Sequence, residues 1–101
     1  MSQEEMIDTI GAEYEIPNGS LYKLRQGEYD QEGLERLLAK LRMIHLTGDM
    51  IRRDLVSVLW YLPLFISYQR ERVEENGYDM KFFDRMEVEV TNLLEEILGT
   101  A

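Results

Sequence analysis

The sequence predicts an all-α domain, and three segments lead to that prediction. Apolar residues recur at helical spacing in residues 34–44 and again in residues 83–98. A third segment, Leu55–Ile66, is apolar on nearly every side and contains Pro63. A helix that is apolar all round must be buried all round or lie partly against a partner. We therefore expect a compact array of four or five helices around a central apolar, proline-containing helix.

The first expected element is a short helix over Ser2–Ile10, with its apolar residues on one side. Gly11 follows it in the position where glycine often ends a helix. The segment Glu13–Ile16 is expected to be extended or irregular, because a residue that precedes a proline avoids the α region.

A turn and a second short helix follow. Pro17-Asn18-Gly19 is a turn signal. Ser20 is expected to cap a helix that runs to Gln26 and is closed by Gly27.

The third helix is better defined, because Asp30 is a good N-cap. Its apolar face is expected to hold Leu34, Leu37, Leu38, Leu41 and Ile44. Thr47-Gly48-Asp49 should end this helix and cap the next, which starts near Met50. Pro63 removes one backbone donor from that next helix. The helix therefore either kinks and continues to Asn76 or breaks and restarts at Pro63, and we expect a kinked or broken continuation.

The last helix has the clearest apolar period. Asp79 is expected to cap it and Gly99 to end it. The residues expected on its inner face are Phe83, Met86, Val90, Leu94 and Ile97.

The composition indicates a single globular domain over residues 1–101, large enough for one modest core. The chain has no cysteine, so it can form neither disulfides nor cysteine-based metal sites. Its N-terminus is acidic and polar, unlike a secretory signal, and its apolar run is too short to span a bilayer. These features together predict a cytoplasmic protein.

The net charge of −9 narrows the choice of partners. It disfavours binding to the nucleic-acid backbone and to anionic membrane surfaces, both of which need clustered basic residues. It favours a basic protein partner. The acidic residues concentrate in residues 1–35 and 73–101, so that two acidic ends flank a basic middle.

No recognisable catalytic motif is present. His45 is the only histidine, and no orienting partner or co-ligand lies near it in the sequence. A calcium loop starting at Asp30 would place Gly33 at its fourth position and Leu41 at its twelfth, where an EF-hand needs glutamate. We therefore predict a non-enzymatic chain with no cofactor and no metal site, with a calcium-responsive acidic protein as an alternative.

The candidate partner-binding residues lie around the start of the third helix. One aromatic side chain and four carboxylates make up this acidic patch, which comprises Glu28, Tyr29, Asp30, Glu32 and Glu35. On protein-binding surfaces aromatic residues act as anchors and charge steers the partner. We expect the patch to dock a basic partner such as a nuclease toxin or a nucleic-acid-handling enzyme. In size, charge and helix content the chain is similar to small bacterial immunity proteins and phage-borne inhibitors.

A second interpretation makes the region Leu55–Ile66 an interface of a small subunit or of a homo-oligomer. The aromatic residues in and after this region, Trp60, Tyr61, Phe65 and Tyr68, could line a ligand groove. At their spacing we instead expect them in the core.

Overall fold

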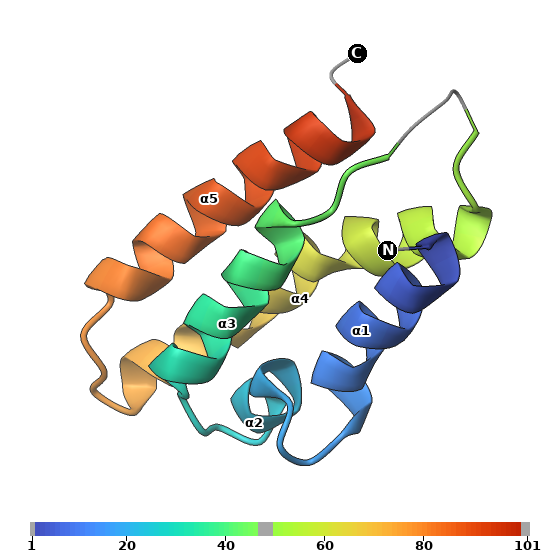
Figure 1. Cartoon of the computed structure of the whole chain (residues 1–101). Coiled ribbons are helices and arrows are strands. Elements are labelled where there is room, and N and C mark those ends of the chain that lie inside the picture. Colours follow the sequence, from blue (N-terminus) through green and yellow to red (C-terminus); the bar gives the residue numbers. More distant parts are fainter. Residues whose placement is uncertain (1, 47–49, 100–101) are drawn as a thin grey trace.

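The computed structural model describes residues 2–46 and 50–99. It contains five helices and, within these ranges, no strand, which confirms the predicted all-α fold (Figure 1). The helices are α1 (Gln3–Glu15), α2 (Ser20–Arg25), α3 (Gln31–Arg42), α4 (Arg53–Glu75) and α5 (Lys81–Leu98).

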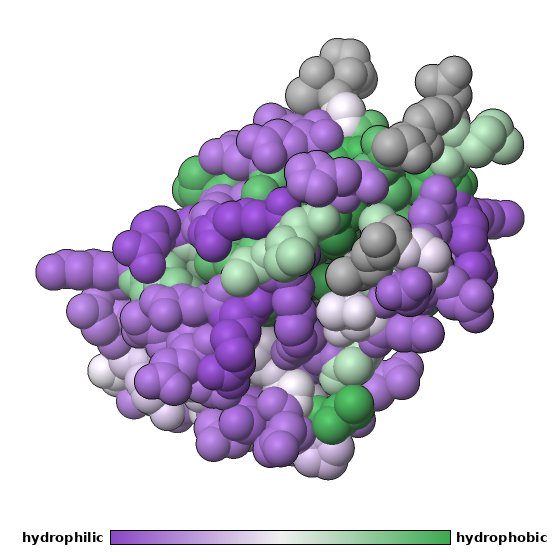
Figure 2. Space-filling view, viewed as in Figure 1, coloured by the Kyte–Doolittle hydropathy of each residue, from purple (hydrophilic) through white to green (hydrophobic). Residues whose placement is uncertain are grey.

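The two longest helices, α4 and α5, run in opposite directions and pack against each other (Figure 1). Helix α1 packs on α4, and α3 packs on α5. The short helix α2 contacts α1, α3 and α4 at one end of the molecule. Hydrophilic side chains cover most of the face seen in Figure 2, and hydrophobic ones show mainly in its upper half, around α5.

The core forms from one side of each helix. The apolar positions predicted for α3 are all buried, and so are the first four of the five positions predicted for α5. The side chains most completely removed from solvent are Ile10, Leu21, Leu24, Leu34, Leu37, Leu41, Leu55, Leu59, Leu62, Ile66, Phe83 and Met86. Burying one such side chain stabilises the fold by roughly 1.5–3 kcal/mol, so this cluster dominates the folding energy.

Helix α1 is longer than predicted. Ser2 caps its start, where the Ser2 hydroxyl accepts a hydrogen bond of 3.1 Å from the Glu5 amide. The expected end at Gly11 is wrong, because the helix continues to Glu15 and uses its additional turn to bring Glu13 and Tyr14 into packed positions. The predicted extended or irregular segment Glu13–Ile16 is therefore helical up to Glu15, and only Ile16, the residue before proline, is extended as expected.

Helix α2 begins after the predicted turn, but its cap differs from the prediction. Gly19 occupies the N-cap position, and Ser20 is the first helical residue. The Ser20 hydroxyl donates instead to a carboxylate oxygen of Glu13, 2.7 Å away. Gly27 follows the helix with a φ of +88°, a conformation that glycine adopts without strain.

Helix α4 runs without interruption through Pro63, so the alternative of a broken helix is wrong. It begins at Arg53 rather than near Met50. The prediction that the third helix extends to Thr47-Gly48-Asp49 is wrong, because α3 ends at Arg42. Residues 47–49 themselves lie outside the described residues. The expected central position of this helix is not confirmed, because α1, α2 and α5 cover only part of its surface.

The C-terminal end of α4 holds the connection between α2 and α3. The Arg72 guanidinium donates to the carbonyl oxygen of Arg25, and the Asn76 amide donates to that of Gly27 at 3.2 Å. Asn76 caps the helix and Gly77, with a φ of +80°, turns the chain toward α5 as predicted.

The N-cap of α5 is Met80 rather than the predicted Asp79, so the helix starts one residue later than expected. Asp79 still accepts a hydrogen bond of 2.9 Å from the Lys81 amide. Gly99 ends the helix as predicted, with a φ of +86°. In the part of the chain that the structure describes, no helix is both long enough and apolar enough to cross a membrane.

Candidate functional site

One side of α4 exposes large apolar side chains to solvent. Trp60 is 65% exposed, Leu64 44% and Tyr68 68%, and these residues follow one another at intervals of four along the helix. Tyr61, which is 47% exposed, lies beside them. We call these four residues the α4 stripe. Residues four apart lie on the same side of a helix, so the stripe is a continuous apolar face rather than scattered residues.

The stripe results from the apolar character of α4 on both sides. Leu55, Leu59, Leu62, Phe65 and Ile66 face the core and are buried. The helices α1, α2 and α5 cover that side, and no other described helix packs on the opposite side. The expectation that all the aromatic residues of this region lie in the core is therefore wrong for the aromatic members of the stripe.

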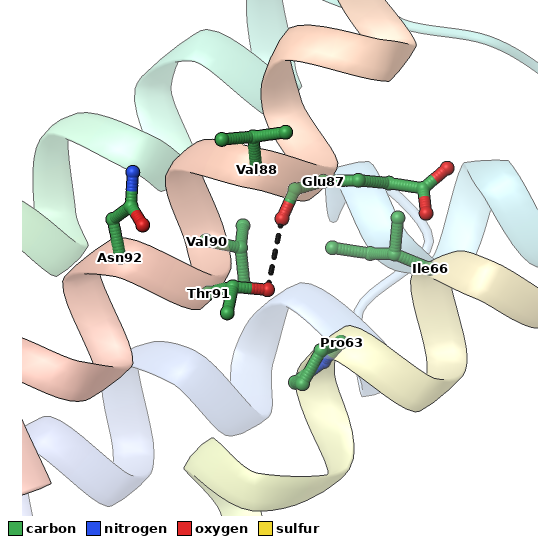
Figure 3. Close-up of a pocket in the computed structure, with 7 residues that line it drawn as sticks. All are labelled: Pro63, Ile66, Glu87, Val88, Val90, Thr91 and Asn92. Atoms are coloured by element: carbon green, nitrogen blue, oxygen red, sulfur yellow. Dashed lines mark hydrogen bonds between the residues drawn. The ribbon is translucent and has the colours of Figure 1, made fainter. Parts of the chain in front are cut away.

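A shallow groove between α4 and α5 borders the stripe. Pro63 and Ile66 of α4 form one wall of it, and the other wall comes from α5 (Figure 3). Its volume is about 320 Å³, and its lining is mostly apolar, with Val88 62% exposed at the surface. The Thr91 hydroxyl donates to the Glu87 carbonyl oxygen at 3.1 Å, so its hydrogen bond stays within α5 (Figure 3).

The groove continues along α5 toward Trp60. A second hollow of about 310 Å³ shares Pro63 and Thr91 with the first, and is also lined by Trp60, Leu94 and Leu98. The indole of Trp60 therefore stands at the edge of a mostly apolar channel. The channel is open to solvent and is not a closed cavity.

On the other side of the stripe, ring contacts hold Tyr61 in place. Its ring centroid lies 6.1 Å from that of Tyr14 and 6.0 Å from that of Phe65. Tyr14 meets Phe65 edge to face at 5.1 Å. The Tyr14 hydroxyl is buried without a hydrogen-bond partner among the described residues, and burial raises its pKa above the ordinary value for tyrosine. These ring contacts hold the Tyr61 side of the stripe in place.

An ion-pair network ties α4 to α5 near the C-terminal end of the stripe. The Arg70 guanidinium pairs with Glu74 at 3.2 Å, as their spacing of four suggests, and also with Asp84 and Glu87. Hydrogen bonds to Asp84 and Glu87 raise the pKa of Arg70 above its ordinary value. The network links α4 to α5 beside the groove, in addition to the apolar packing between the two helices.

The predicted acidic patch divides into exposed and structural residues. Glu28, Glu32 and Glu35 are exposed. Asp30 caps α3, where its Oδ1 accepts from the Gly33 amide and its Oδ2 accepts from the Lys23 ammonium, each at 3.1 Å. These hydrogen bonds, that of Gly33 first, lower the pKa of Asp30.

Tyr29 also belongs mainly to the fold. Its ring packs on Tyr78 at a centroid distance of 5.1 Å and lies near Phe82 and Phe83. Its hydroxyl is buried without a partner among the described residues, and burial is the main cause that raises its pKa to about 12. The prediction of a partner-binding patch here stays a prediction, with the exposed carboxylates of Glu28, Glu32 and Glu35 as its accessible part.

One buried polar cluster has no counterpart in the sequence predictions. The Glu13 carboxylate accepts from the Ser20 amide at 2.8 Å, from the Ser20 hydroxyl at 2.7 Å and from the Lys40 ammonium at 2.6 Å. These groups come from three helices, and the Glu13 carboxylate accepts hydrogen bonds from both of the other residues. The cluster therefore links α1, α2 and α3. Glu13 and Ser20 lie seven residues apart on either side of a turn, and nothing in the sequence pattern predicts that they meet.

His45 is exposed just after α3. Among the described residues, no three histidine, cysteine, aspartate or glutamate side chains gather closely enough to hold a metal ion. No known protein family matches the chain, and neither does any curated protein sequence or solved structure.

Proposed function

We propose that this chain is a non-enzymatic protein-binding module and that the α4 stripe is its docking face. The observation behind the proposal is the solvent exposure of Trp60, Tyr61, Leu64 and Tyr68 along a single helix. Contiguous exposed apolar patches on small domains usually mark interaction sites. Tryptophan and tyrosine are also the residues that most often dominate the energy of protein interfaces.

The shape of the face favours a protein over a small molecule. From Trp60 to Tyr68 the stripe spans nine residues, or about 12 Å of helix. The hollows beside it are open to solvent, so a compact ligand in them would stay partly exposed. A partner helix laid along α4 would instead contact the stripe and the groove over their whole length.

The exposed carboxylates support a second candidate surface. Glu28, Glu32 and Glu35 lie around the start of α3, and the chain as a whole carries a net charge of −9. A basic partner would be attracted to this region, as an inhibitor or immunity-like function requires. Charge of this kind raises the rate of association more than it raises affinity.

The two surfaces can be separated by paired variants of the full chain. Each variant is immobilised and exposed to a lysate of the source organism, and any captured protein is then purified and its affinity measured. If the α4 stripe is the docking face, Trp60→Ala should weaken binding at least about tenfold, as expected for an interface hot spot. The triple variant Glu28→Gln, Glu32→Gln, Glu35→Gln serves as the matched control and should bind with unchanged dissociation rate. The reverse result would transfer the function to the acidic patch.

A further inference from the structure

The exposed side of α4 has a symmetry that extends beyond its apolar centre. Seven exposed residues lie along it, namely Arg53, Ser57, Trp60, Leu64, Tyr68, Glu71 and Glu75. Counted from Leu64, the other six lie four, seven and eleven positions away on either side. At 3.6 residues per turn, all seven fall within about 40° of the Leu64 direction. The spacing therefore reads the same from either end of the helix.

The charges at the two ends of this row are complementary to those of a second row that runs in the opposite direction. Its N-terminal end carries the cation of Arg53, and its C-terminal end carries the carboxylates of Glu71 and Glu75. If a second α4 lies antiparallel across Leu64, Arg53 of each copy faces Glu75 of the other. Trp60 then faces Tyr68, and the two Leu64 side chains meet at the centre. A parallel arrangement would bring like charges together at both ends.

The charges at the two ends of the row are available for such contacts. Among the described residues, no ion pair within the chain involves Arg53, Glu71 or Glu75. Their neighbours are already paired, since Arg52 binds Asp54 at 2.8 Å and Arg70 binds Glu74. Of these three charges, the reversed row brings Arg53 of one copy to Glu75 of the other, while Glu71 faces Ser57.

We propose that the partner of the α4 stripe is a second copy of this chain, bound antiparallel about a two-fold axis at Leu64. This inference rests on the proposed docking function of the stripe. A two-fold interface uses the same surface on both copies, and its contacts occur twice, which the reversible spacing of the row provides. The net charge of −9 on each copy does not prevent pairing at physiological salt, where charges more than about 8 Å apart are largely screened.

The first test is the mass of the full chain by sedimentation velocity over about a hundredfold range of concentration, because dimerisation follows mass action. At the upper concentrations the mass should approach twice 12.0 kDa. Leu64→Glu should keep the chain monomeric, and Glu32→Gln, a matched exposed control, should leave the dimer intact. A chain that is monomeric throughout would overturn the dimer while leaving the docking function to its own test. A dimer indifferent to Leu64→Glu would overturn both.

The second test addresses the antiparallel arrangement. Arg53→Glu and Glu75→Arg should each weaken the dimer about tenfold, since each creates two like-charge contacts at the interface. Both changes place a favourable charge at a helix end, so neither should weaken α4 itself. An equimolar mixture of the two variants should form a heterodimer with about the affinity of the wild-type chain. Single variants that dimerise normally, or a mixture that does not recover, would overturn the antiparallel pairing.

Discussion

The ammonium group of Lys40 on α3 donates a hydrogen bond of 2.6 Å to the carboxylate of Glu13 on α1. The same carboxylate accepts two hydrogen bonds from Ser20, at the start of α2. One buried side chain therefore fixes the relative positions of the three N-terminal helices. Its loss should affect the whole N-terminal half rather than a single helix.

Replacing Glu13 with glutamine should destabilise the protein by about 1–3 kcal/mol, because the Lys40 and Ser20 donors would lose a charged acceptor. Part of the Coulomb energy is screened, since the Lys40 side chain is 43% exposed. Urea unfolding followed by circular dichroism measures the change. The matched control is Glu15→Gln, an exposed position two residues away, which should alter the free energy of unfolding by less than about 0.5 kcal/mol.

The free energy of unfolding should also decrease at acidic pH, in part because Glu13 becomes protonated. Burial alone would raise the pKa of its carboxyl, but the hydrogen bonds from Lys40 and Ser20 outweigh burial and lower the pKa. The folded state thus binds the proton less tightly than the unfolded chain does. The stabilisation is complete above the unfolded pKa of about 4.3 and is lost as the pH falls through the lower folded value. Unfolding curves recorded across this range should show a smaller acid loss in Glu13→Gln than in the wild type, and equal losses would contradict the assignment.

Two glycines of the N-terminal region should respond oppositely to alanine. A Cβ at Gly19 would lie 2.4 Å from the Glu13 carbonyl oxygen, a backbone atom that cannot move aside. Gly19→Ala should therefore cost about 1–3 kcal/mol or more. At Gly11, within α1, a Cβ meets nothing within 4 Å, so Gly11→Ala should stabilise the chain by about 0.5–1 kcal/mol. Thermal melts of the two variants make the comparison directly, and a shift of the same sign in both would refute it.

Truncation to alanine should lower stability far more at Leu59, on the buried side of α4, than at Val88, on the exposed surface of α5. Leu59 is fully buried, so Leu59→Ala should lower the free energy of unfolding by about 2–5 kcal/mol. Val88→Ala, at a position 62% exposed, should change it by less than about 0.5 kcal/mol. Chemical denaturation provides both values, and a loss under about 1 kcal/mol for Leu59→Ala would contradict its place in the core.

Local periodicity predicted the helices that bury one face and expose the other. In α3 and α5 the apolar spacing identified most of the buried positions, because the apolar residues of an amphipathic helix lie on the side that faces the core. The start of α3 at Asp30 and the turn at Gly77 were also predictable, since both depend on the conformational preference of a single residue.

The remaining features depend on contacts between segments far apart in the sequence. Gly11 suggests a helix end whether or not the next helical turn contacts the rest of the protein. The true length of α1 therefore follows only from the contacts of Glu13 and Tyr14. Apolar residues occur on all sides of α4. Its sequence therefore could not show that the side with Trp60 is the one exposed to solvent. Likewise, Tyr29 and Asp30 look like binding residues until their neighbours Tyr78 and Lys23 are in place.

The hydrogen bonds from Arg72 and Asn76 to the backbone of the α2–α3 connection bear on how the molecule opens locally. If the last turn of α4 unwinds, the carbonyl groups of Arg25 and Gly27 lose their donors at the same moment. Amide hydrogen exchange should therefore report these two regions as a single cooperative unit, with matching protection at the α4–α5 turn and at residues 26–30. Fluctuation at one turn of the molecule would then be transmitted to a segment almost fifty residues away along the chain.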